Sequence, residues 1–235
     1  MINFKHSVEA IGVCHSPYKQ KFGIPRQPGL VDAKGTIELI GDYNHPDFVE
    51  GIEQYSHLWL IFSFHENLTQ GFKAKVRPPR LGGNDKMGVL ATRSTFRPNG
   101  IGQSVVRLHS VNRKNGQIRI NISGMDLVDS TPILDIKPYL PFSDNIQDAT
   151  AGFAQQAPQQ LDVHFSQAAL QTLSEQTNHY EVEALISQVL SQDPRPAYKK
   201  NNEDCKIYHI SLYELNISWQ VVENIVIVKN ITNIF

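Results

Sequence analysis

The sequence predicts a mainly β fold for its first two thirds, followed by a small α+β unit. Between Phe4 and Ile122, apolar residues fall in short alternating runs separated by turns rich in Gly and Pro. This pattern is typical of a β-sandwich or β-barrel rather than of alternating strands and helices. Asn115-Gly116 separates two such runs and is a strong hairpin signal. After Asp144 the apolar spacing changes to that of helices.

Short apolar segments define the strands of the first unit. The expected strands are Phe4–Val13, Thr36–Ile40, His57–Glu66, Met87–Thr92, Gln103–Val111 and Gln117–Ile122. His57–Glu66 is the most apolar run in the chain, and its aromatic content favours a central strand. Pro46–Gln54 is expected to be a short helix, since Asp47 lies near its start.

Two loops carry side chains suited to binding. Ser16–Gly29 contains three prolines and two glycines, which favour a rigid irregular shape presenting Arg26 and Gln27. Arg93–Gly102 follows a strand and holds two guanidiniums in a segment that Pro98 keeps from being helical. Taken alone, this second loop is either an anion site or a surface hairpin with solvated arginines.

Charge is concentrated in one part of a chain whose formal net charge is -1. Asp85 is the single acid between Gly71 and Arg107. The eight cations there are Lys73, Lys75, Arg77, Arg80, Lys86, Arg93, Arg97 and Arg107. The cationic zone suits a polyanion, and the alternative is a solvated basic loop.

Several acidic and histidine side chains are candidates for chemistry. His65-Glu66 ends a predicted strand and is either an acid/base or ligand pair or a hydrogen-bonded boundary residue. Asp135 and Lys137 are two residues apart in an extended segment, so both are expected on one face. They form either a structural ion pair or part of an acidic face for ribose hydroxyls or an amino group. Mg²⁺ is chemically possible, but nothing in the segment fixes octahedral geometry.

The C-terminal part is expected to form a unit of its own. Residues 147–160 are rich in Ala and Gln and predict a linker. Helical spacing covers Gln167–Thr177 and Tyr180–Ser191, and Gln192–Lys200 is a rigid basic loop. The expected strands of this unit are Asp162–Phe165, Ile207–Glu214, Leu215–Val222 and Glu223–Lys229.

Composition excludes several classes of protein. The hydrophobic fraction is 40% and the charged fraction 19%, as in soluble globular proteins. No apolar run approaches the roughly 20 residues of a membrane span, and the N-terminus lacks the features of a signal peptide. Cys14 and Cys205 are far apart and have no metal or redox spacing. We therefore expect a cytoplasmic protein with no membrane association and no disulfide scaffold.

The chain resembles the TsaA-like (YaeB, TrmO) family of tRNA methyltransferases over nearly its whole length. The motifs that carry the resemblance are Pro25-Arg26-Gln27-Pro28-Gly29, Arg77-Pro78-Pro79-Arg80-Leu81-Gly82-Gly83, Arg93-Ser94-Thr95-Phe96-Arg97-Pro98-Asn99, Asp126-Leu127-Val128-Asp129, Asp135-Ile136-Lys137-Pro138-Tyr139 and Asp193-Pro194-Arg195-Pro196-Ala197-Tyr198. One departure is Gly100, where close relatives have Pro, and we expect it to make the loop more flexible.

The resemblance implies a fold, an activity and an assembly. A single-sheeted β-barrel over residues 1–146 would bind S-adenosylmethionine, and a linker (147–160) would lead to a small C-terminal domain (161–235). The implied reaction is N6-methylation of threonylcarbamoyl-adenosine at position 37, next to the anticodon of a threonine tRNA. The resemblance also implies a homodimer, with the cofactor cleft close to the subunit contact.

The same resemblance suggests the site residues. It places the cofactor at Pro25, Arg26, Gln27, His65, Glu66, Arg93, Leu108, Asp126, Leu127, Val128 and Asp129. Expected phosphate contacts are Lys73, Lys75, Arg77, Arg80, Arg97, Arg195, Lys199 and Lys200. In this scheme Arg93 serves the cofactor and Arg97 the RNA, and no metal is involved.

The catalytic group remains open at this point, as does the class of function. Asp135, Tyr139 and His65 are the candidates for removing the N6 proton. One alternative function is a non-catalytic barrel that binds a nucleotide or small anion as a sensor. Another is a metal-dependent hydrolase using His57, His65 and Asp135.

Overall fold

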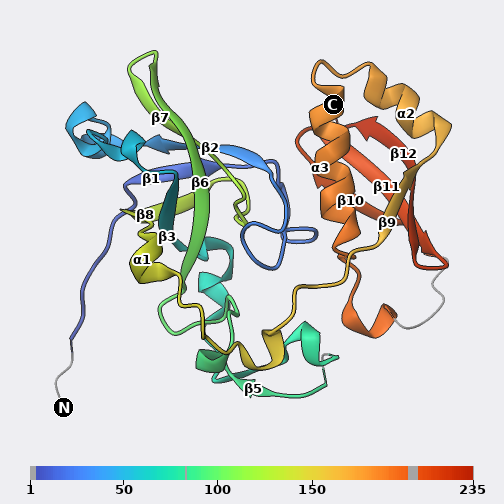
Figure 1. Ribbon diagram of the computed structural model, residues 1–235, viewed down its shortest axis with the longest axis horizontal. Helices are drawn as coiled ribbons and strands as arrows, with labels where there is room; N and C mark the ends of the chain where they lie inside the picture. Colours follow the sequence, from blue (N-terminus) through green and yellow to red (C-terminus); the bar gives the residue numbers. More distant parts are fainter. Residues whose placement is uncertain (1–3, 83, 201–205, 235) are drawn as a thin grey trace.

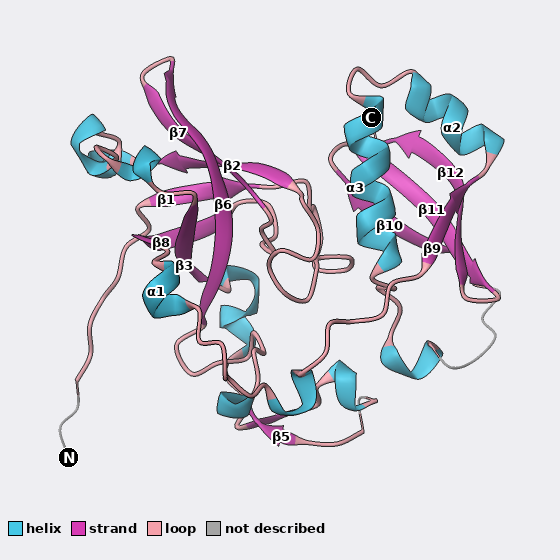
Figure 2. Ribbon diagram, viewed as in Figure 1, coloured by secondary structure: helices cyan, strands magenta, loops and turns pink. Residues whose placement is uncertain are grey.

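A closed β-barrel forms the first unit of the protein. The computed structural model describes residues 4–82, 84–200 and 206–234. Within these residues, six strands close an antiparallel barrel in the order β1-β2-β7-β6-β3-β8 (Figures 1 and 2). The barrel strands are β1 (Gly12–His15), β2 (Lys34–Leu39), β3 (His57–Ser63), β6 (Ile101–Lys114), β7 (Gln117–Ser123) and β8 (Thr131–Pro138). The predicted single-sheeted barrel is confirmed.

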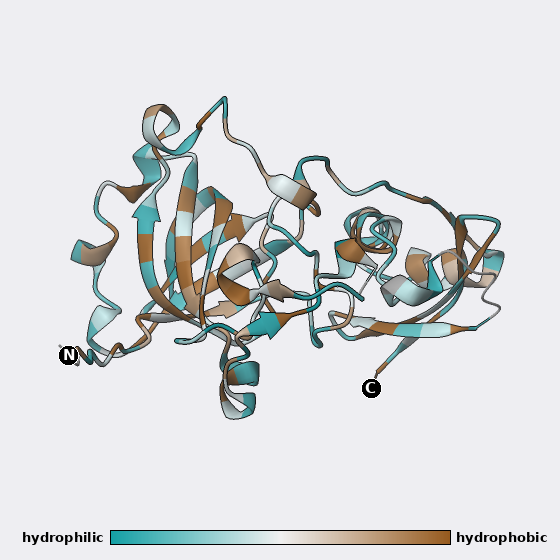
Figure 3. Ribbon diagram, turned by 90° about the horizontal axis from the view of Figure 1, so that it is seen from below, coloured by the Kyte–Doolittle hydropathy of each residue, from teal (hydrophilic) through white to brown (hydrophobic). Residues whose placement is uncertain are grey.

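Every second residue of the barrel strands packs inside. In β3, Leu58, Leu60 and Phe62 are buried and the residues between them are half-buried. Figure 3 shows this alternation as brown and teal bands along the barrel strands. A period of two is what a pleated strand requires when one face meets a core. Closure also removes the free edges that an open sheet would expose.

The hairpin between β6 and β7 forms where the sequence predicted it. Asn115 has φ 53° and Gly116 has φ 80°, so both central residues occupy the left-handed region that a type I′ turn needs. The β6 strand is longer than the predicted Gln103–Val111 and contains a bulge between Leu108 and Ser110.

The helix predicted at Pro46–Gln54 is wrong. That segment forms two 3-10 turns, η2 (Pro46–Phe48) and η3 (Ile52–Gln54). Gly51 lies between them with φ 80°, a conformation that a continuing helix cannot contain.

Two predicted strands are shorter than expected. The strand predicted at Phe4–Val13 begins only at Gly12, where the chain pairs with β2 and β8. Residues 4–9 are exposed and lie outside the barrel. Of Met87–Thr92, only β5 (Met87–Gly88) is a strand, and it pairs with β4 (Lys75–Val76). The remaining short turns and helices of this region are η1 (Gly41–Tyr43), η4 (His65–Gln70), η5 (Pro79–Leu81), η6 (Val89–Ala91), α1 (Pro141–Asp144) and η7 (Gly152–Ala154).

The second unit is α+β, as predicted. Its sheet has the order β10-β11-β12-β9, and β9 runs parallel to β12. The elements are β9 (Asp162–Phe165), α2 (Gln167–Ser174), α3 (His179–Ser191), η8 (Ala197–Lys199), β10 (Tyr208–Leu212), β11 (Leu215–Val222) and β12 (Ile225–Asn233). Ser166 caps α2 by accepting a hydrogen bond from the Ala169 backbone N–H.

The loop after β1 joins the two units. Phe22 stacks with Tyr208 and Trp219 of the second unit, at ring-centroid distances of 6.4 and 6.5 Å. The Tyr213 N–H donates to the Pro17 carbonyl at 2.9 Å. Part of this proline-rich loop is therefore fixed in the core of the second unit, and its shape does not rest on the prolines alone.

No helix among the described residues is long and apolar enough to cross a membrane. Cys14 is buried in β1 with a free thiol, and Cys205 lies outside the described residues.

Candidate functional site

The long loops of the barrel leave from one end of it. They follow β1, β3 and β7 and comprise residues 16–33, 64–100 and 124–130. Figure 1 shows the first loop reaching the second unit, and the loop with β5 running beside the linker. Antiparallel closure puts these distant segments side by side, and they carry most of the predicted site residues.

Arg93 and Gln27 meet at this end. The Arg93 Nη1 donates to Gln27 Oε1 at 2.5 Å, across 66 residues of sequence. Gln27 is half-buried beside the buried Pro25, whereas Arg93 keeps much of its surface exposed. The predicted anion-binding arginine is thus positioned by the proline-rich loop.

A half-buried carboxylate lies next to this pair. Asp126 Oδ1 accepts a 2.5 Å hydrogen bond from the hydroxyl of Ser104, which is buried in β6. Burial raises the pKa of Asp126 to about 6, while Ser104 and the positive charge of Arg93 act in the opposite direction. Tyr18 also interacts electrostatically with Asp126, and its buried hydroxyl has no hydrogen-bond partner among the described residues. A half-buried acid and a buried, unpaired hydroxyl are suited to a polar ligand.

The Asp126-Leu127-Val128-Asp129 motif divides between two surroundings. Ser16 ties its second half to β1, because the Ser16 hydroxyl donates to the Leu127 carbonyl at 2.8 Å and the Ser16 N–H to Asp129 at 3.0 Å. Burial raises the pKa of Asp129, but the hydrogen bonds from Ser16 and Lys19 outweigh it, and the net pKa is lowered. Asp126 is therefore the weaker acid of the two.

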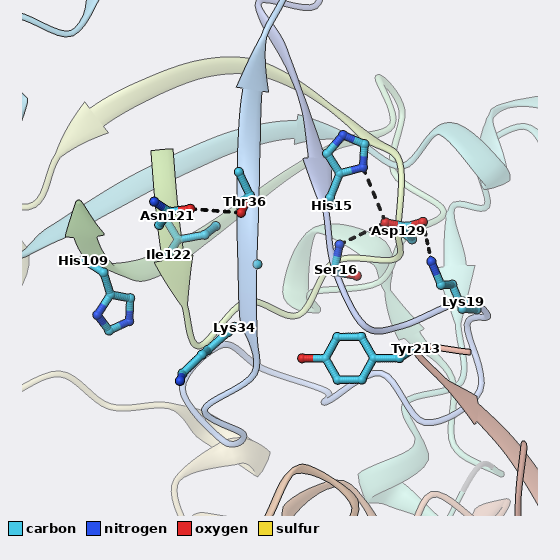
Figure 4. Close-up of a pocket in the computed structure, with 11 residues that line it drawn as sticks. His15, Ser16, Lys19, Lys34, Thr36, His109, Asn121, Ile122, Asp129 and Tyr213 are labelled. Carbon is cyan, nitrogen blue, oxygen red and sulfur yellow. Dashed lines mark hydrogen bonds and ion pairs between the residues drawn. The ribbon is translucent and has the colours of Figure 1, made fainter. Parts of the chain in front are cut away.

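Asp129 faces an open groove of about 640 Å³ on the outer wall of the barrel (Figure 4). Lys19 lies 3.1 Å and His15 3.8 Å from its carboxylate. Tyr213 of the second unit closes one side of the groove, and Lys34 lies on the rim. The groove thus takes residues from both units.

His65 and Glu66 follow β3, which ends at Ser63 and not at Glu66 as predicted. Lys21 Nζ donates to the Glu66 carbonyl at 3.1 Å and lies 3.4 Å from its carboxylate. This contact anchors the start of η4 to the proline-rich loop, so His65 and Glu66 lie at the same end of the barrel as Arg93.

Three predicted site residues do not join this group within one chain. Tyr139 donates its N–H to the His57 carbonyl, and Leu108 donates to the Ser56 carbonyl, both at the opposite end of β3. β3 extends about 20 Å at roughly 3.3 Å per residue. Asp135 lies on the outer face of β8 opposite Ile61, and no ion pair joins it to Lys137 on the same face.

Some of the predicted phosphate-binding cations already have protein partners. Arg97 donates to the Thr92 carbonyl at 2.7 Å and so orders its own loop. Arg195 is 2% exposed and its guanidinium donates two hydrogen bonds to the Asp193 carboxylate, which makes it a structural residue in this conformation and not a surface cation. Lys200 lies 3.7 Å from the same carboxylate. Of the predicted phosphate contacts, Lys73, Lys75, Arg77 and Arg80 keep exposed side chains.

The described residues contain no group of three or more His, Cys, Asp or Glu side chains placed to hold a metal ion. His57 and His65 lie at opposite ends of β3, so the set required by the hydrolase alternative does not converge.

Sequence reasoning missed Tyr18 and Ser104. Ser104 carried a usable signal, because it occupies an inward position of a strand whose other inward residues are apolar. Tyr18 carried no such signal. Its position depends on a backbone bridge to Leu212, which is nearly 200 residues away in the sequence.

The whole fold has been seen in solved structures. A crystal structure of TrmO from Pseudomonas aeruginosa superposes with a TM-score of 0.81 at 38% identity, covering 98% of this chain and 99% of that one. A second TrmO crystal structure gives a TM-score of 0.81 at 40% identity. The fold is that of these TrmO structures, a class of barrel proteins distinct from folds with a Gly-rich βαβ nucleotide-binding unit.

Sequence comparison then gives the particular family. The model described as the tRNA-methyltransferase O N-terminal domain matches residues 13–145, and the TrmO C-terminal domain model matches residues 158–234. The chain belongs to the tRNA-methyltransferase O family. It is 48% identical to the tRNA (adenine(37)-N6)-methyltransferase of Escherichia coli K12, over 92% of this chain and 93% of the relative. It is also 48% identical to a putative S-adenosylmethionine-dependent methyltransferase of P. aeruginosa PAO1, over 91% and 92%.

Proposed function

We propose that this protein transfers the methyl group of S-adenosylmethionine to N6 of threonylcarbamoyl-adenosine at position 37 of a threonine tRNA. Membership of the tRNA-methyltransferase O family and the names of its E. coli and P. aeruginosa relatives support this activity. In this proposal residues 1–146 form the cofactor-binding domain, 147–160 the linker and 161–235 the C-terminal domain. The protein would act in the cytoplasm, on tRNA.

The observation that carries the proposal is the group formed by Arg93, Gln27, Asp126 and Tyr18. S-adenosylmethionine supplies a methyl group activated by its sulfonium charge. A guanidinium suits its carboxylate, while the half-buried carboxylate of Asp126 and the unpaired hydroxyl of Tyr18 suit its ribose hydroxyls. The rest of the proposed cofactor site is Pro25, Arg26, His65, Glu66, Leu127, Val128 and Asp129.

Among the three candidate bases, His65 is the one proposed, because it lies at the same end of the barrel as Arg93 within one chain. The acceptor N6 belongs to a urea-like group, so removal of its proton favours transfer. Alignment of acceptor and methyl group accounts for much of the acceleration, since effective molarity contributes roughly 7–11 kcal/mol in well-oriented reactions. The Arg93–Gln27 hydrogen bond and the Lys21–Glu66 contact hold two walls of the site for this purpose.

We further propose a homodimer in which each site is completed by the other subunit. Asp135, Tyr139 and Leu108 lie away from the Arg93 group in one chain, so a second copy is needed to bring them there. The surface next to Tyr139 is apolar: Phe142 is 90% and Ile146 66% exposed. Exposed apolar side chains of this size are typical of interaction surfaces.

The exposed cations of the 64–100 loop are proposed to meet the RNA backbone. Arg77 has an exposed side chain, and Arg80 already reaches the linker, where its Nη2 donates to the Gln156 carbonyl at 2.6 Å. Replacing Arg77 by Ala should weaken tRNA binding and flatten its salt dependence by about one counterion. An unchanged slope would remove Arg77 from the interface.

The deciding experiment uses labelled S-adenosylmethionine and two tRNAs, one carrying the threonylcarbamoyl group and one lacking it. Label in the first RNA alone is the expected result. Cofactor binding measured by calorimetry without label in either RNA would instead support the sensor alternative.

A further inference from the structure

A small crevice separates η4 from the loop that carries Arg97. Its volume is about 170 Å³. Leu68, Phe72 and Pro98 give it apolar walls, and Asn67, Asn99 and Arg97 add polar groups. Pockets for complete small-molecule ligands measure roughly 300–1,000 Å³, so this crevice suits a single ring system.

Backbone hydrogen bonds hold both sides of the crevice in place. The Phe64 N–H donates to the Gly100 carbonyl at 2.7 Å, and the Lys73 N–H donates to the Phe96 carbonyl at 3.2 Å. Gly100 has φ 59°, and a Cβ there would lie 2.5 Å from Leu68 Cδ2. The positive φ favours glycine at this turn, and the two backbone hydrogen bonds hold the walls of the crevice in place.

The polar group that points to a ligand is Asn67. This residue lines the crevice and is 9% exposed, yet its side-chain amide makes no hydrogen bond within the described part of the chain. The amide atoms of Asn67 are not among the fully buried polar atoms that lack a partner, so they reach the open space of the crevice and stay available to a ligand. An amide offers one acceptor and two donors, the combination that pairs with the edge of a nucleobase.

The surroundings favour RNA as the source of that base. Phe72 is 64% exposed and offers a ring face. Lys73 lies 4.0 Å from the centroid of Phe96, which places a cation beside the crevice. Single-stranded RNA is read by stacking unpaired bases on aromatic rings and by bonding their edges, with cations on the phosphates.

We propose that this crevice receives one unstacked base of the tRNA anticodon loop, stacked on Phe72 and hydrogen-bonded to Asn67. The proposal rests on the proposed function, because that function brings an anticodon loop to this end of the barrel. The Arg93 group remains the cofactor site, and the crevice supplies a separate contact that selects and positions the RNA.

The test combines protein and RNA changes. Phe72→Ala is compared with Leu90→Ala, a control in the same loop region that removes an apolar side chain 76% exposed and outside the crevice. Each variant is titrated with threonylcarbamoylated anticodon stem-loop RNA and with versions that lack one loop base at a time. Asn67→Asp, checked for an unchanged melting temperature, gives a second variant that alters the bonding edge. Cofactor affinity is measured by calorimetry.

We expect Phe72→Ala to weaken binding of the intact RNA roughly 5- to 50-fold, as loss of a stacking aromatic does. The effect should vanish for the RNA lacking one particular base, and Leu90→Ala should change nothing. The proposal would be overturned if Phe72→Ala lost the same affinity for every abasic RNA, or lost none. Weaker cofactor binding without a change in RNA affinity would also overturn it. If the Phe72→Ala effect depends on one loop base but the wild-type protein transfers no label to tRNA, the proposed function is contradicted and the crevice assignment stands.

Discussion

Arg93 donates a 2.5 Å hydrogen bond to Gln27 and thereby joins two loops that lie 66 residues apart in the sequence. One loop is anchored in the second unit through Phe22, and the other leads into β6. The geometry of the proposed cofactor site therefore depends on how the two units pack together.

This hydrogen bond predicts coupled effects on cofactor binding. Arg93→Ala should weaken S-adenosylmethionine binding by about 2–3 kcal/mol, since a charge-assisted contact to the carboxylate is lost. Gln27→Ala should cost less, because it removes the positioning group alone. Calorimetry on the two single variants and the double variant should give a coupling energy of about 0.5–3 kcal/mol. Additive effects would show that Gln27 does not orient Arg93.

The raised pKa of Asp126 predicts that the stability of the protein falls as pH rises through a defined window. Burial raises its pKa from the usual 3.8 to about 6 in the folded protein. Between these values the unfolded chain has lost a proton that the folded chain keeps, so this group lowers stability as pH rises from about 4 to 6. Asp126→Asn removes the effect and should stabilise the protein by about 3 kcal/mol above pH 6, at 1.36 kcal/mol per unit.

The measurement is thermal or urea unfolding of both proteins from pH 4 to pH 7. The difference between them should grow across this window and then level off. A difference that is constant with pH would mean that Asp126 is already ionised at pH 4. Ser104→Ala serves as the companion variant, because loss of its hydrogen bond should move the window to higher pH.

The backbone conformation of Gly100 predicts that an alanine substitution there lowers the stability of the protein. Its φ of 59° is strained for residues with a side chain, and the added Cβ would meet Leu68 at 2.5 Å. Gly100→Ala should lower the free energy of unfolding by about 1–3 kcal/mol. Gly88→Ala is the matched control, because nothing lies within 4 Å of its Cβ position and its φ is negative. Equal effects of the two substitutions would show that the Leu68 contact yields easily.

The proposed dimer predicts complementation between two inactive variants. Arg93→Ala disables the cofactor end, and Tyr139→Ala disables the opposite end of β3. If each site uses both subunits, a dimer of one variant with the other contains one intact site. Random mixing makes about half of the dimers mixed, and each has one working site of two, so activity should recover to about a quarter of the wild-type value. Labelled methyl transfer after co-refolding measures this. No recovery, with dimers present, would place both residues in the same subunit's site.

The buried pair of Asp193 and Arg195 predicts a stability effect in the second unit. Asp193→Asn removes the carboxylate that accepts two hydrogen bonds from the 2% exposed guanidinium and should cost about 3–5 kcal/mol. Asp47→Asn is the control, because its side chain is 82% exposed. A small effect in both would mean that Arg195 relaxes towards solvent.

Much of the barrel could be predicted from the sequence. The alternation in His57–Ser63 and the Asn115-Gly116 turn each follow from local rules, and both formed as predicted. The predicted helix at Pro46–Gln54 failed for a reason also present in the sequence, since Gly51 takes a left-handed conformation there. The early end of β3 at Ser63 had no such local signal.

The sequence by itself determined the strand pattern, the cationic zone and the family motifs, because each depends on residues close together in the chain. Tertiary structure alone decided which motif residues meet. Barrel closure brings Gln27, Arg93 and Asp126 to one end, and it carries Tyr139 to the other. Tertiary contacts also buried Arg195 against Asp193 and left the Tyr18 hydroxyl without a partner among the described residues. Hydrogen bonds and desolvation arise between distant segments, so they take effect only once the sheet has closed and the second unit has packed against it.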